Sequence, residues 1–276
     1  MRRSDPSGQP VRRHSLVTRI WHWVNAVVLP IMLMSGLMIF NAHPRLYWGN
    51  YGANFDPSWF EIDATSGGEG MMRIGSLRIV TTGLLGVWTD GDGQVRQTAF
   101  PGWATIPSQY SLADARLWHM AFAWVLAGGL LIFLLWSLVS GHVRRDLHIT
   151  RHEWRWRSIR HDLGQHVRLR FPAGAAAMRY GVLQKLAYGF VLFIALPLMI
   201  LTGLAMAPGA EAAGHWLSGM FGGRQTARSL HFIAAFALAA FFAVHIVMVL
   251  LSGPVNQLRA MVTGWYRLPR EREGER

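Results

Sequence analysis

The sequence predicts an all-α integral membrane protein: a bundle of four transmembrane helices with a long extracytoplasmic loop between the first and the second. Three observations predict this fold class. Of the 276 residues, 51% are hydrophobic and only 15% are charged, against about 25% charged residues in a typical soluble domain. Four apolar stretches are long enough to cross a hydrocarbon core of about 30 Å, which takes about 20 helical residues. Most Lys and Arg residues lie in segments that would all be on one side of the membrane.

The four expected spans cover residues 17–40, 113–140, 182–206 and 226–252. Pro30 and Pro197 lie inside the first and third spans, where each is expected to kink its helix. The first span follows basic residues, as a signal peptide does, but it is too long for the apolar core of one and carries His22 and Asn25. We therefore expect residues 1–276 to form one membrane domain.

Basic residues set the expected orientation. The N-terminal tail to Arg19 holds five Lys and Arg residues, residues 141–185 hold ten, the tail after the fourth span holds five, and seven lie elsewhere. The positive-inside rule then puts both termini and the middle loop in the cytoplasm, in a multi-pass protein of the bacterial inner membrane. This distribution explains the net charge of +12, so we expect no nucleic-acid partner.

The two long loops have different characters. The basic cytoplasmic loop, residues 141–181, interleaves Trp with Arg and is expected to lie on the membrane surface against anionic lipid headgroups. The outer loop, residues 41–112, is rich in Gly, aromatic and acidic residues. Its segment 87–100 predicts two short strands around an Asp-Gly turn, with a calcium loop as the weaker interpretation. A structured loop of this size is a plausible docking surface for a partner.

Histidines inside the spans are the strongest functional signal. There is no cysteine, which excludes disulfides, thiolate metal sites, iron–sulfur clusters and covalently attached haem. Four histidines fall inside the expected spans: His22, His119, His231 and His245. The last two are fourteen residues apart on one helix, close to four turns, so their rings leave nearly the same face about 21 Å apart.

These histidines form two pairs at matching depths. His22 and His245 lie near the cytoplasmic ends of their spans and are called the inner pair; His119 and His231 lie near the outer ends and are called the outer pair. Two imidazoles that face each other from neighbouring helices can supply both axial ligands of a haem iron. Two alternatives remain: polar residues satisfied by interhelical hydrogen bonds, and a proton relay, for which the spans lack interior Asp or Glu.

Three of the four histidines follow an arginine by three residues, and these arginines are Arg19, Arg116 and Arg228. A residue three positions earlier lies on the same face, one turn nearer the membrane surface. Arginine pairs well with carboxylates, so we expect Arg19 to bind the propionates of an inner haem, and Arg116 and Arg228 to bind those of an outer haem. The alternative is that all three are ordinary arginines at the membrane interface. Gly36, fourteen residues after His22, should allow close approach of a flat ring at the outer level.

With these residues in view, the chain resembles the bacterial cytochrome b561 and nickel–iron hydrogenase cytochrome b family, most closely the branch of thiosulfate reductase cytochrome B subunits and cytochrome b/b6 domain proteins. The resemblance covers nearly the whole chain. The matching segments are Arg19-Ile-Trp-His-Trp23, Ser35-Gly-Leu37, Phe100-Pro-Gly-Trp-Ala-Thr-Ile-Pro107, Arg116-Leu-Trp-His119, Ser140-Gly-His-Val-Arg-Arg-Asp146, Tyr180-Gly-Val-Leu-Gln-Lys-Leu-Ala-Tyr188, Leu201-Thr-Gly-Leu204 and Phe221-Gly-Gly-Arg-Gln-Thr-Ala-Arg-Ser-Leu-His231.

The resemblance implies two non-covalent b haems ligated from the first, second and fourth spans, a quinone as one redox partner, and an extracytoplasmic catalytic redox subunit, often a molybdopterin oxidoreductase, as the other. The expected role is that of an electron-transfer subunit and not of a complete enzyme. The alternatives are a haem-free membrane anchor or assembly subunit, a haem-free transporter, and a stand-alone quinol:acceptor cytochrome b.

Overall fold

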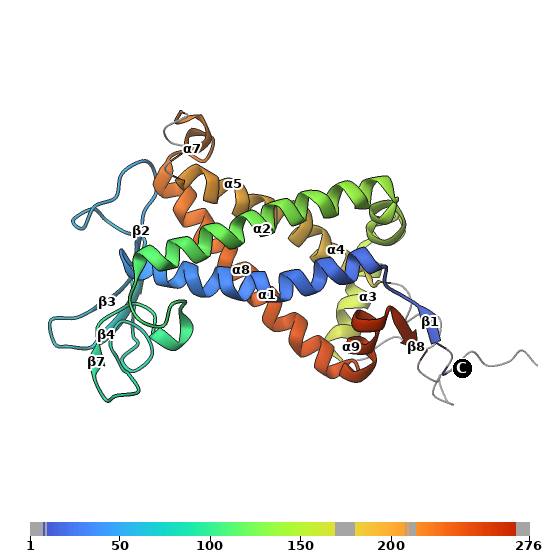
Figure 1. The fold of residues 1–276 in the computed structure, drawn as a ribbon, viewed down its shortest axis with the longest axis horizontal. Helices are drawn as coiled ribbons and strands as arrows, with labels where there is room; N and C mark the ends of the chain where they lie inside the picture. Colours follow the sequence, from blue (N-terminus) through green and yellow to red (C-terminus); the bar gives the residue numbers. More distant parts are fainter. Residues whose placement is uncertain (1–7, 9, 169–179, 208, 210–213, 269–276) are drawn as a thin grey trace, which may run out of the picture. The chain divides into compact units, whose positions relative to one another are not determined.

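Four long apolar helices dominate the computed structural model (Figure 1). It describes residues 8, 10–168, 180–207, 209 and 214–268. The helices are α1 (Leu16–Asn41), α2 (Leu112–Val139), a third made of α4 (Val182–Phe190), η4 (Val191–Ala195) and α5 (Leu196–Met206), and α8 (Arg224–Leu251). Each is long and apolar enough to cross a membrane, and each matches an expected span to within two residues.

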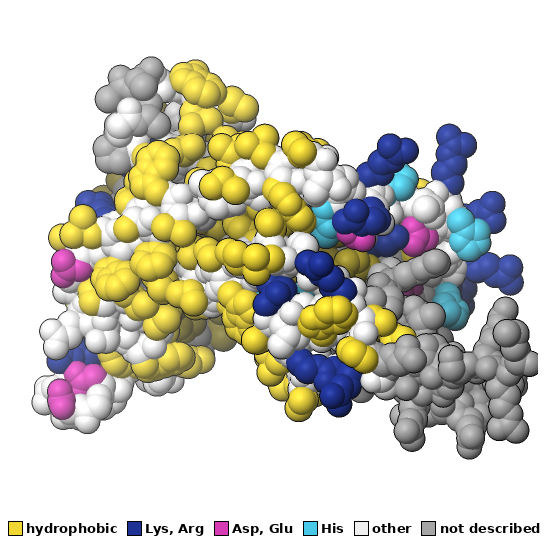
Figure 2. Space-filling model, turned by 45° about the vertical axis from the view of Figure 1, so that its right-hand side comes forward, with side chains coloured by type: hydrophobic (Ala, Val, Ile, Leu, Met, Phe, Trp, Pro, Cys, Tyr) yellow, Lys and Arg dark blue, Asp and Glu magenta, His cyan; other side chains and the backbone are white. Residues whose placement is uncertain are grey.

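The surfaces of these helices are apolar, as contact with lipid requires. On α2, for example, Leu131, Ile132, Leu135 and Leu138 are all more than half exposed. Figure 2 shows hydrophobic side chains covering the long helices. A contiguous apolar surface of this kind is not found on soluble monomers, so this protein has lipid as a partner.

Proline has different consequences in two of the helices. Pro197 is the second residue after the π-helical turn η4. Because proline has no N–H and its ring collides with the carbonyl four residues earlier, the chain widens into a π turn before it, a common form of helix distortion. Pro30 lies inside α1, which remains one helix.

The described chain forms two compact units. The first unit is Met1–Asn25, Gly128–Ala195 and Ala240–Arg276, and the second is Ala26–Ala127 and Leu196–Ala239. The four long helices each contribute residues to both units, and each unit holds one of the two histidine pairs. The expectation of one membrane domain stays a prediction.

In the first unit, both ends of the chain meet. Strand β1 (Pro10–Arg12) pairs antiparallel with β8 (Trp265–Arg267), which follows the short helix α9 (Pro254–Thr263). Tyr266 of β8 is buried with residues of α9. The two terminal segments are therefore on the same side of the spans, as the charge distribution predicted.

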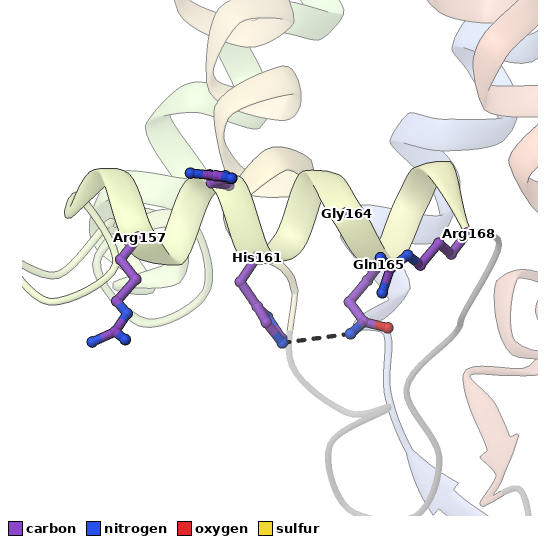
Figure 3. Close-up of a pocket in the computed structure, with 6 residues that line it drawn as sticks. Arg157, His161, Gly164, Gln165 and Arg168 are labelled. Atoms are coloured by element: carbon purple, nitrogen blue, oxygen red, sulfur yellow. Dashed lines mark hydrogen bonds between the residues drawn. The ribbon is translucent and has the colours of Figure 1, made fainter.

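The basic loop folds into the π-helical segment η2 (Val143–Leu147) and helix α3 (Trp156–Val167), while residues 169–179 lie outside the described residues. Asp162 of α3 accepts a hydrogen bond from the Leu183 N–H at 2.8 Å, and so caps the start of α4. Another face of α3 is basic and lines a shallow pocket (Figure 3) formed by Arg157, Arg160, His161, Gly164, Gln165 and Arg168. Its binding to anionic lipid stays a prediction.

In the second unit, the outer loop forms a small antiparallel sheet. Its strand order is β2 (Arg45–Leu46), β3 (Phe60–Ala64), β4 (Gly70–Ile74) and β5 (Leu77–Val80). The short helices η1 (Gly102–Ala104) and α7 (Trp216–Met220) complete this unit. The sheet and the following loop bury Leu46, Phe60, Ile62 and Phe100 against Phe40 at the end of α1, with Phe232 of α8 packed on the same core.

The predicted hairpin is confirmed. Strands β6 (Trp88–Thr89) and β7 (Val95–Arg96) pair antiparallel. The Asp90 carboxylate closes the turn, because it accepts hydrogen bonds from the N–H groups of Asp92 and Gln94 and from Arg96. These bonds explain the Asp-Gly pattern without the calcium ion of the weaker interpretation.

Hydrogen bonds fasten the outer loop to the start of α8. The Gly49 carbonyl accepts hydrogen bonds from the N–H groups of Gln225 and Thr226, which have no partner inside the helix. The Trp59 indole N–H donates to the Ser229 hydroxyl at 3.0 Å, and that hydroxyl donates to the Tyr47 carbonyl. The outer loop is thus built onto the start of α8 at Arg224, two turns before His231.

Candidate functional site

The inner pair lies within the first unit. His22 of α1 and His245 of α8 have ring centres 6.2 Å apart, and the ring planes make an angle of 59°. Phe241, one turn before His245, stacks on that ring, and Trp23 meets His22 edge-on. The Nδ1 atom of His22 is buried and has no hydrogen-bond partner among the described residues.

The outer pair lies within the second unit and repeats this geometry. His119 of α2 and His231 of α8 have ring centres 6.2 Å apart and an interplanar angle of 60°. Here the Nδ1 atoms have partners: the Ser35 hydroxyl lies 3.0 Å from Nδ1 of His119, and the Thr202 hydroxyl lies 2.9 Å from Nδ1 of His231. Both hydroxyl groups belong to fully buried residues.

Both separations suit one metal ion bound between two imidazoles. A metal–imidazole bond is about 2.0 Å long and the nitrogen lies about 1.1 Å from the ring centre, so two ligands on opposite sides of a metal have ring centres about 6.2 Å apart. The rings of each pair are tilted, at 59° and 60°, so neither pair is a stacked contact. The donor set is two neutral imidazoles, which suits haem iron.

The structure places the predicted arginines at the ends of the same helices. Arg19 donates to the carbonyls of Met261 and Val262. Arg228 donates to the His43 carbonyl and lies over the ring of Phe40. Arg116 is exposed at the start of α2.

Gly36 lies against a ring of the outer pair. A Cβ atom at this position would be 3.3 Å from Cε1 of His119. Gly203 of α5 has the same relation to His231, at 3.4 Å. Sequence reasoning missed Gly203, Ser35 and Thr202 as site residues. The available signal was the repeat of a hydroxyl residue, glycine and leucine at 35–37 and 202–204.

A polar cluster in the first unit includes residues of the basic loop and of the N-terminal segment. His142 and Asp146 form a hydrogen bond with Nδ1 and Oδ2 2.7 Å apart, and the His142 ring packs on Trp136. Burial, with the charge of Arg13, lowers the pKa of His14 to about 4, and charges on His22 and His142 act on it too. Burial raises the pKa of Tyr180, which also feels the charge of Asp146.

Comparison with known proteins shows the family of this chain. The sequence model of the prokaryotic cytochrome b561 family matches residues 13–264. The chain belongs to this family. It is a membrane haem protein of the b561 type, which binds haem b and transfers electrons. The family resemblance predicted from the sequence is therefore confirmed.

One curated relative has a name that bears on function. The chain is 26% identical over 246 residues to the putative protein-methionine-sulfoxide reductase subunit YedZ1 of Azospira oryzae (strain ATCC BAA-33 / DSM 13638 / PS), an alignment that covers 89% of this chain and 93% of the relative. No solved structure matches the chain.

Proposed function

We propose that this cytochrome b561 protein is a di-haem electron-transfer subunit that passes electrons from membrane quinol to an extracytoplasmic reductase. The observation that carries the proposal is the repeated geometry of the two histidine pairs, each with ring centres 6.2 Å apart. One non-covalent b haem would be held by His22 and His245, and the other by His119 and His231. When bound, each haem supplies one-electron redox chemistry.

The protein's own residues would orient and charge-balance these haems. Arg19 and Arg228 now donate to backbone carbonyls, but a guanidinium has five N–H donors and can bind a propionate as well. Arg116 is exposed and free to reach one from the helix start. We assign Arg19 to the inner haem, and Arg116 and Arg228 to the outer one. Gly36 leaves room beside the outer pair.

We propose that both terminal segments are cytoplasmic, and the pairing of the terminal strands supports this orientation. Strands β1 and β8 bring both terminal segments together, and these segments, with the basic loop, hold most of the Lys and Arg residues. The positive-inside rule assigns this side to the cytoplasm, in a bacterial inner membrane. The sheet β2–β5 and the outer pair then belong to the extracytoplasmic side.

Quinol oxidation releases two protons with two electrons, so its site needs a proton acceptor near a haem. The hydrogen-bonded His142–Asp146 pair of the first unit, the unit that also holds the inner pair, is our candidate for this acceptor. A histidine held by a carboxylate is a common general base. We propose that quinol binds beside this cluster and gives its two protons to His142 in turn, with His142 passing the first proton to bulk water before it accepts the second.

The outer loop is the proposed docking surface for the catalytic redox subunit. It exposes a set of aromatic side chains, namely Trp48, Tyr51, Phe55, Trp103 and Tyr110. Exposed Trp and Tyr are typical of protein interfaces. The name of the Azospira relative, a reductase subunit, supports a reductase as the partner, and the family resemblance supports a molybdopterin enzyme.

Anaerobic reduction of the purified protein in lipid nanodiscs tests this function. A water-soluble quinol should reduce two b haems, and Asp146→Asn should slow reduction at least tenfold without changing haem content. Asp114→Asn, at an exposed position at the start of α2, is the matched control and should reduce at the wild-type rate. A protein without a haem spectrum would instead be an anchor or assembly subunit. Rapid reduction of small acceptors with no co-purifying subunit would indicate a stand-alone quinol:acceptor cytochrome b.

A further inference from the structure

Two different helices present the same pair of residues to the two rings of the outer pair. On α1, the Ser35 hydroxyl contacts Nδ1 of His119, and Gly36 lies against Cε1 of the same ring. On α5, Thr202 and Gly203 make the same two contacts with His231. The oxygen–nitrogen distances are 3.0 and 2.9 Å, and the distances from a glycine Cβ position to Cε1 are 3.3 and 3.4 Å.

The direction of these hydrogen bonds follows from the single hydrogen on each hydroxyl. The Ser35 hydroxyl lies 2.7 Å from the Ile31 carbonyl, and the Thr202 hydroxyl lies 2.6 Å from the Leu198 carbonyl. A carbonyl can only accept, and each carbonyl is closer to the hydroxyl than Nδ1 is (2.7 against 3.0 Å, and 2.6 against 2.9 Å), so we assign each hydroxyl hydrogen to the carbonyl of its own helix. Each hydroxyl oxygen must then accept from the imidazole Nδ1–H. This arrangement puts the proton on Nδ1 and leaves the lone pair on Nε2, the atom available for a metal.

The glycine beside each hydroxyl makes this contact possible. A side chain at Gly36 or Gly203 would press on the ring at Cε1, the carbon between the two nitrogens. The ring edge is thus fixed by a hydroxyl at Nδ1 and by backbone at Cε1. Ser35 and Thr202 are themselves fully buried, so water does not compete for either bond.

Among the described residues, no hydroxyl group supports the inner pair in this way. The buried Nδ1 of His22 has no hydrogen-bond partner within the described part of the chain. The two pairs therefore have the same ring spacing but differ in the hydrogen-bond partners of the Nδ1 atoms.

We propose that Ser35 and Thr202 are positioning residues that fix the tautomer of both outer ligands and lower the reduction potential of the outer haem relative to the inner one. This inference rests on the proposed function, because it requires a haem at the outer pair. A hydrogen bond from Nδ1–H to a fixed acceptor increases the electron density at Nε2 and makes it a more basic ligand. A more basic ligand favours the ferric over the ferrous state. The third span, which supplies no ligand, thereby acts on the haem through Thr202.

Potentiometric titration with optical and electron paramagnetic resonance detection tests this proposal. Thr202→Val keeps the side-chain volume and removes the hydroxyl; Ser35→Ala removes the other hydroxyl. Each should raise the midpoint potential of the outer haem, change its low-spin ferric signal and weaken its retention about 10- to 100-fold, with the inner haem unchanged. Thr202→Ser should restore the wild-type values. Ser137→Ala is the matched control, because its buried hydroxyl has no partner among the described residues.

The outcomes separate this inference from the proposed function. If the protein binds two haems but neither hydroxyl variant changes the midpoint potential or the ferric signal of the outer haem, the inference is overturned and the proposed function is not. Equal shifts at both haems would overturn it too, since a general loosening of the protein would then explain them. A wild-type protein without an outer haem would overturn the proposed function. If Thr202→Val fails to fold, Ser35→Ala tests the same claim on a different helix.

Discussion

Glu61 should control how firmly the outer sheet is held. Its side chain, only 14% exposed, accepts hydrogen bonds from Arg45 at 2.8 Å and from Arg73 at 2.5 Å. Glu61→Gln removes the charge that balances both arginines. A hydrogen bond to a charged group contributes about 1.5–3 kcal/mol. In this variant Arg45 keeps its hydrogen bond to Asp63, and Arg73 keeps its hydrogen bond to Ser58. We therefore expect the local free energy of unfolding of the sheet to fall by about 2 kcal/mol, less than the full value of both lost bonds.

Hydrogen exchange of the β3 and β4 amides in nanodiscs measures this loss. About 2 kcal/mol corresponds to about 30-fold faster exchange. Glu69→Gln, at an exposed position of the same loop, is the matched control and should change exchange less than twofold. Unchanged protection of β3 and β4 in Glu61→Gln would refute the reasoning, because the charge network would then contribute nothing.

The same residue gives a pH dependence of known sign. Burial alone would raise the pKa of Glu61, but the hydrogen bond from Arg73 and the charges of both arginines outweigh it, and the pKa lies below the ordinary value of 4.5. The stabilisation is therefore complete above pH 4.5 and is lost as the pH falls through the lower, folded-state pKa. Protection of β3 should decline with acid in the wild type and show no such Glu61-dependent step in Glu61→Gln.

Three further predictions concern other contacts. Asn41→Ala should lower the local stability around residues 97–101 by about 2–3 kcal/mol and make them cleavable by protease, because the Asn41 amide forms hydrogen bonds with both the N–H and the carbonyl of buried Phe100. Asn41→Asp retains only the acceptor and should be cleaved at a rate between those of Asn41→Ala and the wild type. Cleavage of Asn41→Ala at the wild-type rate would contradict this prediction. Gly129→Val should lower haem retention at the inner pair, since a Cβ there would lie 3.0 Å from the Trp21 ring that stacks on Phe133. Gly128→Val is the control, because nothing lies near a Cβ at that position. Equal haem content in the two variants would argue against this prediction. Protein produced without haem should melt at lower temperature and regain stability as haem is added, because a ligand bound only by the folded state stabilises it; a melting temperature independent of haem would count against both sites.

The sequence predicted the features that depend on local patterns. Uninterrupted apolar length located the four spans, and the fourteen-residue spacing of His231 and His245 located the two levels at which rings could meet. The hairpin of β6 and β7 followed from its Asp-Gly turn. Each of these signals lies within a segment that forms its structure mainly from its own residues.

Features built by distant segments were not predictable in this way. The pairing of β1 with β8 joins residues about 250 positions apart, and no local pattern reports such a partner. The sheet β2–β5 consists of strands of two to five residues, too short for a clear alternation. Ser35 and Thr202 looked like ordinary residues of an apolar helix, and only the position of the neighbouring helix shows that each faces a histidine ring.

The haem content of single and double histidine variants tests the central claim most directly. A pyridine haemochrome assay on the wild-type protein should give two b haems per chain. His22→Ala and His245→Ala should each leave one, and the double variant should also leave one, because both side chains hold the same haem; His119→Ala and His231→Ala should behave likewise. The combination of His22→Ala with His119→Ala should leave none. A double variant within one pair that loses both haems, or a single variant that retains two, would contradict the account.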